Sequence, residues 1–388
     1  MSYAETQPIY ESRLLKGLRT SPLPQLDMEL TERCNNNCLH CYINLPEEDP
    51  IARDKELTLD EIKDTLAQAA DLGCLTVRFT GGEPLLREEF PEIYLAARRL
   101  GMKVSLFTNG TLITDKIIHL FSRIPPLKEV EVSLYGMTQA SYEGVSCVRG
   151  SFEKAFDGVK KLAAANIPFI LKGALLSSHT GEQQAFEIFA SQVPWMKGKP
   201  ALVMHYELRG RGDLKKNERI RQLRISPDLW VKHLHQYGAP LMEEARFFQN
   251  KFTVKPGDGH KLFSCQAGKN LCVDAYGGLQ ACMLLRDPET VYDLKKGSLK
   301  EAIDHFFPKI LKKTADNPDF IERCGHCILR GMCDQCPAKS WMEHGALDTP
   351  IEYYCEIAHA EAEYLGLIEK GEKGWGGAER RGKGARKR

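Results

Sequence analysis

The sequence contains no uninterrupted apolar segment of the roughly 18–20 residues that a membrane-spanning helix requires. Residues 1–26 carry acidic residues and prolines and lack the apolar centre of a secretory signal. An excess of one charge is also missing, because 53 Lys and Arg face 52 Asp and Glu, for a net charge of +1. No general field therefore draws the chain to a membrane or to nucleic acid. We expect a cytoplasmic protein that binds neither.

A Ser-His-Asp set and a convincing pair of acid–base residues are also missing. Cysteine, in contrast, is abundant, with 13 in 388 residues. An odd number in a chain of this length argues against a disulfide framework, and clustered thiols in a reducing compartment more often bind metal. Three of the cysteines lie at 34–41 and eight at 265–355, while Cys74 and Cys147 stand apart. The two clusters are therefore the candidates for metal chemistry. Cys74 is expected to be a small buried apolar side chain. Cys147 is expected to be an ordinary side chain, with a place near the active site as the alternative because it lies two residues before Arg149.

Residues 26–207 alternate apolar, strand-like runs with amphipathic helical patterns. The expected strands are 26–31, 75–80, 103–108, 129–134, 168–176 and 201–207. The expected helices lie near 58–72, 88–100, 114–122, 151–165 and 182–193, the first opened by a capping box of Thr58 and Glu61. This alternation predicts an α/β fold of parallel strands with right-handed crossovers. The six units are fewer than the eight of a closed barrel, so the pattern allows an open partial barrel or a doubly wound sheet.

The composition of the sequence changes along the chain, and these changes predict five segments. Residues 1–25 form an N-terminal extension, 26–225 the α/β domain and 226–262 a bridging helical segment. Residues 263–365 are rich in Cys and Gly and need metal to hold them. Residues 366–388 are polar and basic at the tip, which indicates a disordered tail, or alternatively a nucleic-acid-binding arm.

The first cysteine cluster, Cys34, Cys38 and Cys41, directly follows the first expected strand with the spacing C-x3-C-x2-C. Three thiolates this close can hold three corners of a cubane iron–sulfur cluster, which leaves the fourth iron open to a substrate or cofactor. The alternative is a zinc site completed by His40 or by a distant ligand.

The next strand ends in Gly81, Gly82 and Glu83, where two glycines let a ligand approach the backbone and exposed carbonyls can accept from an ammonium group. This turn beside the cysteine loop resembles the radical S-adenosylmethionine (SAM) superfamily over residues 26–207. The resemblance implies a partial (β/α)6 TIM-like barrel in which Cys34, Cys38 and Cys41 bind a [4Fe–4S] cluster. It also implies that SAM chelates the open iron and that Gly81, Gly82 and Glu83 hold its amino group.

The same resemblance carries further expected SAM contacts onto the ends of later strands. Asn109 is similar to a polar residue that contacts SAM, and Ser133 to a ribose or carboxylate contact. Arg149 is similar to an arginine that pairs with the SAM carboxylate, a partner that suits a guanidinium fork. The alternative for each is a turn-forming residue or a solvated arginine. In the family, reductive cleavage of SAM gives a 5′-deoxyadenosyl radical that takes hydrogen from an unactivated carbon, while the protein orients the reactants and excludes water.

The second group of cysteines could supply two four-cysteine sites. Taken alone, the pairs Cys324/Cys327 and Cys333/Cys336 are typical of a zinc ribbon. Beside the first motif, the pattern resembles the SPASM extension of radical SAM peptide-modifying enzymes, which carries two auxiliary [4Fe–4S] clusters; its usual last internal spacing is x3, and here it is x2. The ligands implied for the first auxiliary cluster are Cys265, Cys272, Cys282 and Cys336, and those for the second are Cys324, Cys327, Cys333 and Cys355.

The resemblance implies an enzyme, a radical SAM oxidoreductase that oxidatively modifies a peptide or protein by a crosslink, a thioether or a side-chain oxidation. A peptide substrate would dock directly or through a separate adaptor, and flavodoxin or ferredoxin would supply single electrons. Arg209 or Arg211, after the last strand, could bind a substrate carboxylate or form part of a solvated loop. The alternatives are an enzyme that modifies tetrapyrrole (haem) side chains, and a zinc- or cluster-binding scaffold without catalysis.

Overall fold

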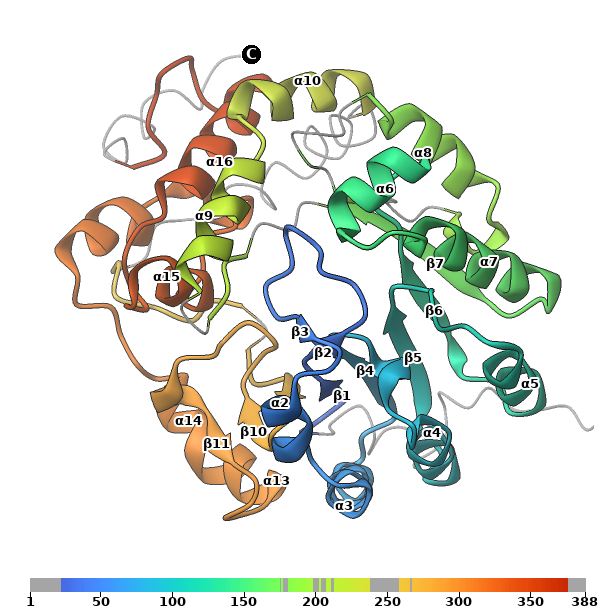
Figure 1. Cartoon of the computed structure of the whole chain (residues 1–388). Helices are drawn as coiled ribbons and strands as arrows, with labels where there is room; N and C mark the ends of the chain where they lie inside the picture. Colours follow the sequence, from blue (N-terminus) through green and yellow to red (C-terminus); the bar gives the residue numbers. More distant parts are fainter. Residues whose placement is uncertain are drawn as a thin grey trace, which may run out of the picture. The chain divides into compact units, whose positions relative to one another are not determined.

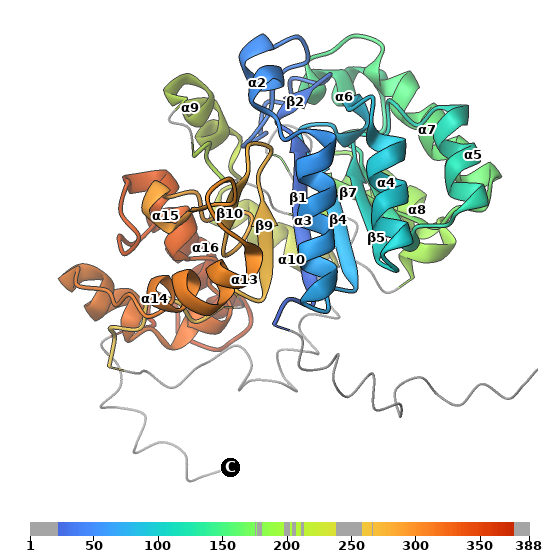
Figure 2. The ribbon, with the colours of Figure 1, turned by 90° about the horizontal axis from the view of Figure 1, so that it is seen from below.

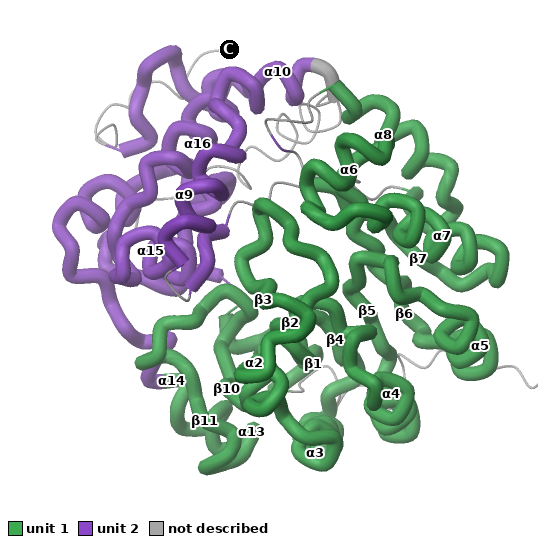
Figure 3. The backbone as a smooth tube through the Cα atoms, in the orientation of Figure 1, with its two compact units in different colours: residues 1–175, 179–205, 266–308 green, residues 176–178, 206–265, 309–388 purple. Residues whose placement is uncertain are grey.

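A computed structural model describes residues 22–174, 176, 181–197, 202–203, 207–210, 213–237, 258–265 and 267–375. The chain divides into two compact units, coloured separately in Figure 3. Unit 1 comprises Met1–Leu175, His179–His205 and Gln266–Pro308, and unit 2 comprises Leu176–Ser178, Tyr206–Cys265 and Lys309–Arg388.

Unit 1 is built on a parallel sheet whose strands stand side by side in chain order. They are β1 (Gln25–Thr31), β4 (Thr76–Gly81), β5 (Lys103–Thr108), β6 (Leu127–Ser133), β7 (Phe169–Ala174) and β8 (Leu202–Val203). A doubly wound sheet reverses its strand order at a switch point, and this order has no such reversal. The partial barrel is therefore confirmed, and all six expected strands are present.

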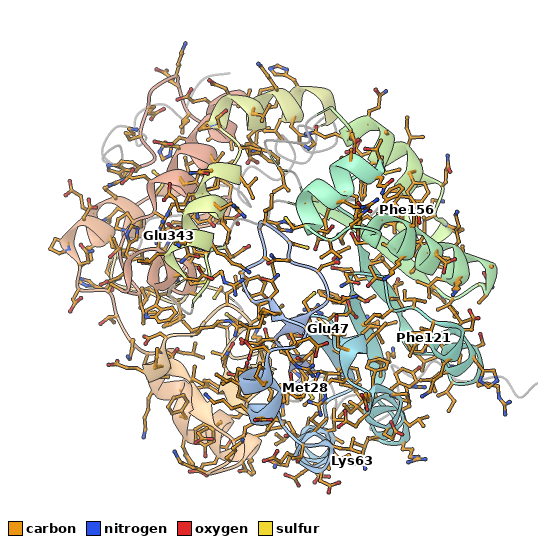
Figure 4. The ribbon with its side chains drawn as sticks, viewed as in Figure 1. Met28, Glu47, Lys63, Phe121, Phe156 and Glu343 are labelled. Atoms are coloured by element: carbon orange, nitrogen blue, oxygen red, sulfur yellow. The ribbon has the colours of Figure 1, made fainter. Side chains whose placement is uncertain are left out.

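Amphipathic helices follow the strands and cover one side of the sheet (Figures 1 and 2). They are α3 (Leu59–Asp71), α4 (Phe90–Arg99), α5 (Asp115–Arg123), α7 (Ser151–Ala164) and α8 (Gln183–Ser191). The Thr58–Glu61 capping box opens α3 as predicted. The core lies between sheet and helices, where Met28 and Phe121 are buried, whereas Lys63 lies on the outer side of α3 (Figure 4).

Shorter elements connect this framework. They are β2 (Arg33–Cys34), β3 (Leu45–Pro46), α2 (Pro50–Lys55), η2 (Pro84–Leu86), α6 (Gln139–Ser146) and η4 (Pro194–Met196). The sequence patterns did not predict α6, a two-turn helix between β6 and α7 that begins at a capping box of Thr138 and Ser141.

The cysteine-rich segment, expected as one domain from residue 263, is divided between the units. Its first part adds strands β9 (Asn270–Val273), β10 (Gly278–Gln280) and β11 (Tyr292–Asp293) to the sheet of unit 1. Strand β9 pairs parallel with β1 and antiparallel with β10, so it satisfies the backbone groups along the β1 edge. The short helices η5 (Pro288–Thr290), α13 (Leu299–Glu301), η6 (Ala302–Phe306) and α14 (Phe307–Ile310) follow.

Unit 2 is mainly helical. Its elements are α9 (Leu214–Leu223), α10 (Pro227–Tyr237), η7 (Phe320–Gly325), η8 (Ile328–Gly331), α15 (Pro337–His344) and α16 (Glu352–Tyr364). The helix expected over the bridging segment is α10, and residues 238–257 lie outside the described residues. Helices α10 and α16 are joined by the Trp230 indole, which donates to Glu361 at 3.0 Å.

The start of the expected tail is ordered. Leu367 and Ile368 are buried in a small core with Leu329 and Cys327, and Trp375 packs against it. The predicted tail, 366–388, is therefore too long by at least ten residues. The apolar side chains at 367, 368 and 375 pack in or against this core. Residues 376–388 lie outside the described part. Among the helices that are described, none combines the length and apolar character needed to cross a membrane.

Candidate active site and cysteine sites

The first cysteine loop leaves β1 at the carboxyl edge of the parallel strands. Helix α6 holds it by two backbone hydrogen bonds, Asn37 N–H to the Ser146 carbonyl at 2.9 Å and Leu39 N–H to the Val145 carbonyl at 3.0 Å. These carbonyls belong to the last turn of α6, where helix carbonyls have no partner within the helix. The loop and the helix therefore satisfy each other's backbone groups.

The three thiols of the loop lie in a low-dielectric setting. Cys38 is buried, and Cys34 and Cys41 are half-buried. Burial raises the pKa of the Cys34 thiol, with further increases from Glu83 and Cys41. Burial also raises the pKa of the Cys38 thiol, with further increases from Cys41 and Cys34. Backbone N–H groups already point at two sulfurs, Asn36 to Cys34 at 3.4 Å and Asn44 to Cys41 at 3.3 Å.

This donor set fits an iron–sulfur cluster. Soft thiolates favour iron–sulfur centres, and a bound cationic centre would provide the charge that lets buried thiols ionise. The side-chain amide of Asn36, inside the loop, has no hydrogen-bond partner at either atom although the residue is only 3% exposed. Within the described residues, no three His, Cys, Asp or Glu side chains meet as they would around a single metal ion.

The glycine turn packs directly on the cysteine loop. Gly82 N–H donates to the Thr31 carbonyl at 2.7 Å, and Glu83 N–H donates to the Arg33 carbonyl at 2.9 Å. A Cβ atom on Gly81 or on Gly82 would lie 2.2 Å from the Thr31 or Arg33 oxygen, respectively. The backbone that approaches these glycines closely is thus that of the cysteine loop itself, which sequence reasoning had not foreseen.

The Glu83 carboxylate ties the turn to the end of β5. It accepts from the Thr108 hydroxyl at 2.9 and 3.0 Å, from Asn109 N–H at 2.8 Å and from Leu85 N–H at 3.1 Å. Burial raises the pKa of Glu83 to about 7, although these hydrogen bonds oppose the increase. Both carboxylate oxygens are occupied by the protein, so the groups of this turn left to face a ligand are backbone carbonyls.

Asn109 connects the same strand end to the cysteines. Its amide donates to the Asn35 side chain at 2.8 Å and lies 3.7 Å from the Cys34 sulfur. Three of the predicted site elements therefore meet: the cysteine loop, the Gly81–Glu83 turn and Asn109. Ser133 ends β6, half-buried and close to Tyr135, whereas Arg149 is exposed in the turn before α7.

Two buried ion-pair networks support the loop, and no local sequence pattern predicts either of them. In the first, the Arg33 guanidinium donates to both Glu56 oxygens at 2.8 and 3.0 Å, and Arg87 lies 3.4 Å from the same carboxylate. Arg87 also donates to the Leu30 and Leu57 carbonyls. Glu56 thus holds both Arg33, which precedes Cys34, and Arg87, which follows the short helix η2.

The second network lies within unit 1 and joins the cysteine loop to the segment that follows Cys282. Arg286 pairs with the buried Glu29 of β1 and lies 3.8 Å from Glu32. Its guanidinium stands 5.6 Å above the Tyr42 ring, which adjoins Cys41. Burial raises the pKa of Glu29 to about 7, against the opposing effect of Arg286.

The later cysteines fall into two groups by location. Cys272 and Cys282 belong to unit 1, and Cys265 and Cys336 to unit 2, so the set implied for the first auxiliary cluster is divided between units. The set implied for the second lies wholly in unit 2, where it lines a pocket of about 570 Å³. The cysteines that line this pocket are Cys265, Cys324, Cys327, Cys333, Cys336 and Cys355.

The remaining candidates from the sequence have simpler surroundings. Cys74 is buried and donates to the Thr76 carbonyl at 3.2 Å, and Cys147 is exposed. Arg209 is 2% exposed and lies 3.6 Å from Asp213, so it is part of the interior of unit 2 and not of a solvated loop. Arg211 lies outside the described residues.

Comparisons with known proteins agree with this geometry. The Radical SAM superfamily matches residues 28–182. An AdoMet-dependent heme synthase from Methanosarcina barkeri is 25% identical over 344 residues, which are 82% of this chain and 92% of that protein. A PqqA peptide cyclase from Streptomyces rochei is 33% identical over 141 residues, but these are 36% of this chain and 37% of that protein.

Among solved structures, Streptococcus suis SuiB bound to the precursor peptide SuiA superimposes with a TM-score of 0.62 at 14% identity. The similarity covers 88% of this chain and 78% of SuiB and shows a shared fold. The superfamily implies SAM and a [4Fe–4S] cluster, which the buried cysteine loop fits. The cysteine loop and the glycine turn both lie within residues 28–182, the part of the chain that matches the Radical SAM superfamily.

Proposed function

We propose that the chain is an enzyme that cleaves SAM reductively and abstracts hydrogen from a peptide or protein substrate, which it modifies by a crosslink, a thioether or a side-chain oxidation. The carrying observation is the union of the cysteine loop and the Gly81–Glu83 turn at the ends of adjacent parallel strands. The peptide substrate is supported by similarity to a PqqA peptide cyclase and by the fold shared with SuiB, solved with its precursor peptide.

In this proposal, Cys34, Cys38 and Cys41 hold the [4Fe–4S] cluster. When bound, the cluster and SAM supply the 5′-deoxyadenosyl radical. The backbone carbonyls of the Gly81–Glu83 turn accept from the SAM amino group, because the Glu83 carboxylate is already occupied within the protein. Asn109 fixes Cys34 and orients the SAM site, while Ser133 and Arg149 supply further SAM contacts from later strand ends.

The later cysteines are proposed to hold two auxiliary [4Fe–4S] clusters of a SPASM extension. The second set has the stronger support, since Cys324, Cys327, Cys333 and Cys355 surround one pocket in unit 2. Cys265, Cys272, Cys282 and Cys336 would hold the first. Fully ligated clusters have no open iron, so they would carry electrons to or from the substrate, or fasten the segment together. Flavodoxin or ferredoxin would be the external reductant, and a separate adaptor could present the peptide.

Modification of a tetrapyrrole side chain is the second candidate. A specific observation favours it: the similarity to the heme synthase extends over 82% of this chain, far beyond the radical SAM domain. The similarity to the peptide cyclase covers 36% of the chain. The shared radical SAM domain fits either substrate, so the choice between them requires a direct comparison.

Anaerobic reconstitution tests the cofactor part. Three [4Fe–4S] clusters correspond to about twelve irons per chain, and reduction in the presence of SAM should release 5′-deoxyadenosine. Replacing Cys34, Cys38 and Cys41 with Ala should remove about four of these irons and abolish the release. Cys74→Ala is the matched control, because this buried cysteine lies outside both groups. Bound zinc without SAM cleavage would contradict the proposal in favour of a scaffold.

Substrate choice is tested with the same protein. One arm offers short Cys- or Tyr-bearing peptides, and the other an iron tetrapyrrole with propionate side chains. The expected result is faster 5′-deoxyadenosine release with a peptide and a peptide mass lowered by a pair of hydrogens. Decarboxylation of the tetrapyrrole, with all peptides unchanged, would replace the peptide proposal by its alternative.

A further inference from the structure

Helix α6 holds the cysteine loop and also directs one side chain into it. Tyr142 lies three and four residues before Val145 and Ser146, whose carbonyls bind the loop, so all three share one face of the helix. The Tyr142 side chain is fully buried. Its ring lies 6.0 Å from Tyr135, and Tyr135 in turn lies 4.7 Å from His40, between Cys38 and Cys41.

The Tyr142 hydroxyl has no hydrogen-bond partner. Burial raises the pKa of Tyr142, and the nearby ionisable groups of Cys38, Glu83 and Cys34 raise it further, so the hydroxyl lies near the cysteine loop. Asn36 is also near, and neither atom of its buried amide has a partner. Although the two side chains are neighbours, no hydrogen bond of normal geometry joins them.

Buried polar groups without partners are rare and costly, and those found in native structures usually await an ion, a water or a ligand. Here two such groups, one on α6 and one in the loop, lie near the same cysteine loop. An aromatic hydroxyl and a side-chain amide are both hydrogen-bond donors. Hydrogen bonds to the sulfurs of an iron–sulfur cluster are one of the means by which a protein sets its reduction potential.

We propose that Tyr142 and Asn36 donate hydrogen bonds to the [4Fe–4S] cluster held by Cys34, Cys38 and Cys41, and thereby raise its reduction potential. Reduction adds one electron and negative charge to the cluster, so donors stabilise the reduced form more than the oxidised form. No proton is transferred and no bond is broken. This inference rests on the cluster-binding part of the proposed function and is independent of the substrate.

The test compares wild type with Tyr142→Phe, which removes the hydroxyl and keeps the ring. Full-length protein is reconstituted anaerobically and titrated by EPR without SAM. The signal missing from the Cys34, Cys38 and Cys41 triple Ala variant is assigned to this cluster. We expect unchanged iron content and a lower midpoint potential. The equilibrium constant for reduction should fall roughly tenfold, which corresponds to about 59 mV for one electron. Pulsed EPR in D2O should show one exchangeable-hydrogen coupling fewer.

Tyr94→Phe is the matched control. Tyr94 is an equally buried tyrosine, but it lies in α4 and its hydroxyl donates to the Ile124 carbonyl at the end of α5. Its loss should leave the potential and the couplings unchanged. Asn36→Leu, of similar volume and without a donor, provides a second variant if Tyr142→Phe assembles poorly; we expect it to lower the potential as well.

Each result has a distinct meaning. An unmoved potential and unmoved couplings in both variants, at full iron content, would overturn the inference and indicate that Tyr142 and Asn36 pair with each other. A shift seen only after SAM is added would also overturn it, by making SAM the acceptor. Absence of a cluster from the wild-type protein would instead overturn the proposed function.

Discussion

The two cysteine regions of this chain are built differently. The first lies on a loop whose backbone N–H groups donate to carbonyls of α6 and whose start accepts from the glycine turn, and a buried network of Arg33, Glu56 and Arg87 supports it. In the second, Cys324 lies in the π-helical η7, Cys327 and Cys333 flank the 3-10 helix η8, and six cysteines line an open volume of about 570 Å³.

The difference concerns what holds each region together. Short 3-10 and π segments have poor hydrogen-bond geometry and contribute little stability of their own. Hydrogen bonds and ion pairs of the protein hold the first loop, whereas the second region has only a small apolar core beside a pocket that six cysteines line. We infer that the first is a pre-organised cofactor site and that the second depends on its proposed cluster for its fold.

Iron removal is the most direct way to break this comparison, and it should have the largest effect. After anaerobic chelation, we expect amide hydrogen exchange to accelerate strongly across η7, η8 and α16, where the pocket cysteines lie. The strands β4 and β5 should keep most of their protection. Equal loss of protection in both regions, or retention in both, would contradict the inferred difference.

Glu56→Gln tests the support beneath the first loop. Glu56 is a buried carboxylate shared by Arg33 and Arg87, and its removal leaves two buried guanidinium groups without it. Loss of one partner from a buried ion pair costs about 3–5 kcal/mol. We expect a loss of that order in the free energy of unfolding of unit 1, measured by denaturant titration.

The control is Glu48→Gln, because Glu48 pairs with Arg53 on the surface at 3.7 Å. Exposed pairs contribute about 0–1 kcal/mol. Similar losses in the two variants would show that the Glu56 network does not hold the loop.

The pH dependence of the first region should reside partly in Glu83. Its folded-state pKa of about 7 exceeds the ordinary 4.5, so the folded protein keeps a proton that the unfolded chain releases. This contribution to stability is complete below pH 4.5 and is lost as the pH rises through 7. The loss is about 3 kcal/mol at roughly 1.4 kcal/mol per pH unit.

Glu83→Gln cannot titrate and should therefore show a flatter pH profile of the unfolding free energy between pH 5 and 8, whatever its absolute stability. An unchanged slope would show that the hydrogen bonds from Thr108 and Asn109 outweigh burial and keep Glu83 ionised.

The sequence predicted the parts of this structure that depend on local patterns. The six strands and the Thr58–Glu61 cap follow from apolar periodicity and capping chemistry. The cysteine loop and the Gly81–Glu83 turn could be placed together because the ends of successive parallel strands meet at one edge. The role of Gly82 could not be predicted, because the Arg33 oxygen comes close to Gly82 only in the folded chain.

What the sequence missed depends on long-range contacts. Arg286 pairs with Glu29 across 257 positions, and no local pattern marks either residue. The cysteine-rich segment is divided because its strand β9 pairs with the edge of β1. The composition of the segment does not predict this pairing. Helix α6 was not predicted because it has only 8 residues and few of them are buried, so its apolar periodicity is weak.

Cys147 offers the smallest and sharpest test, because it belongs to neither cysteine region. It ends α6 in the left-handed conformation with φ 54° and is exposed. Glycine is the residue that this helix-ending position favours, and a side chain there costs roughly 1 kcal/mol. Cys147→Gly should therefore raise the free energy of unfolding by about 0.5–1 kcal/mol and leave the iron content unchanged. If iron were lost, Cys147 would have to count among the ligands of the first loop, whose shape would then depend on its metal as the second region does.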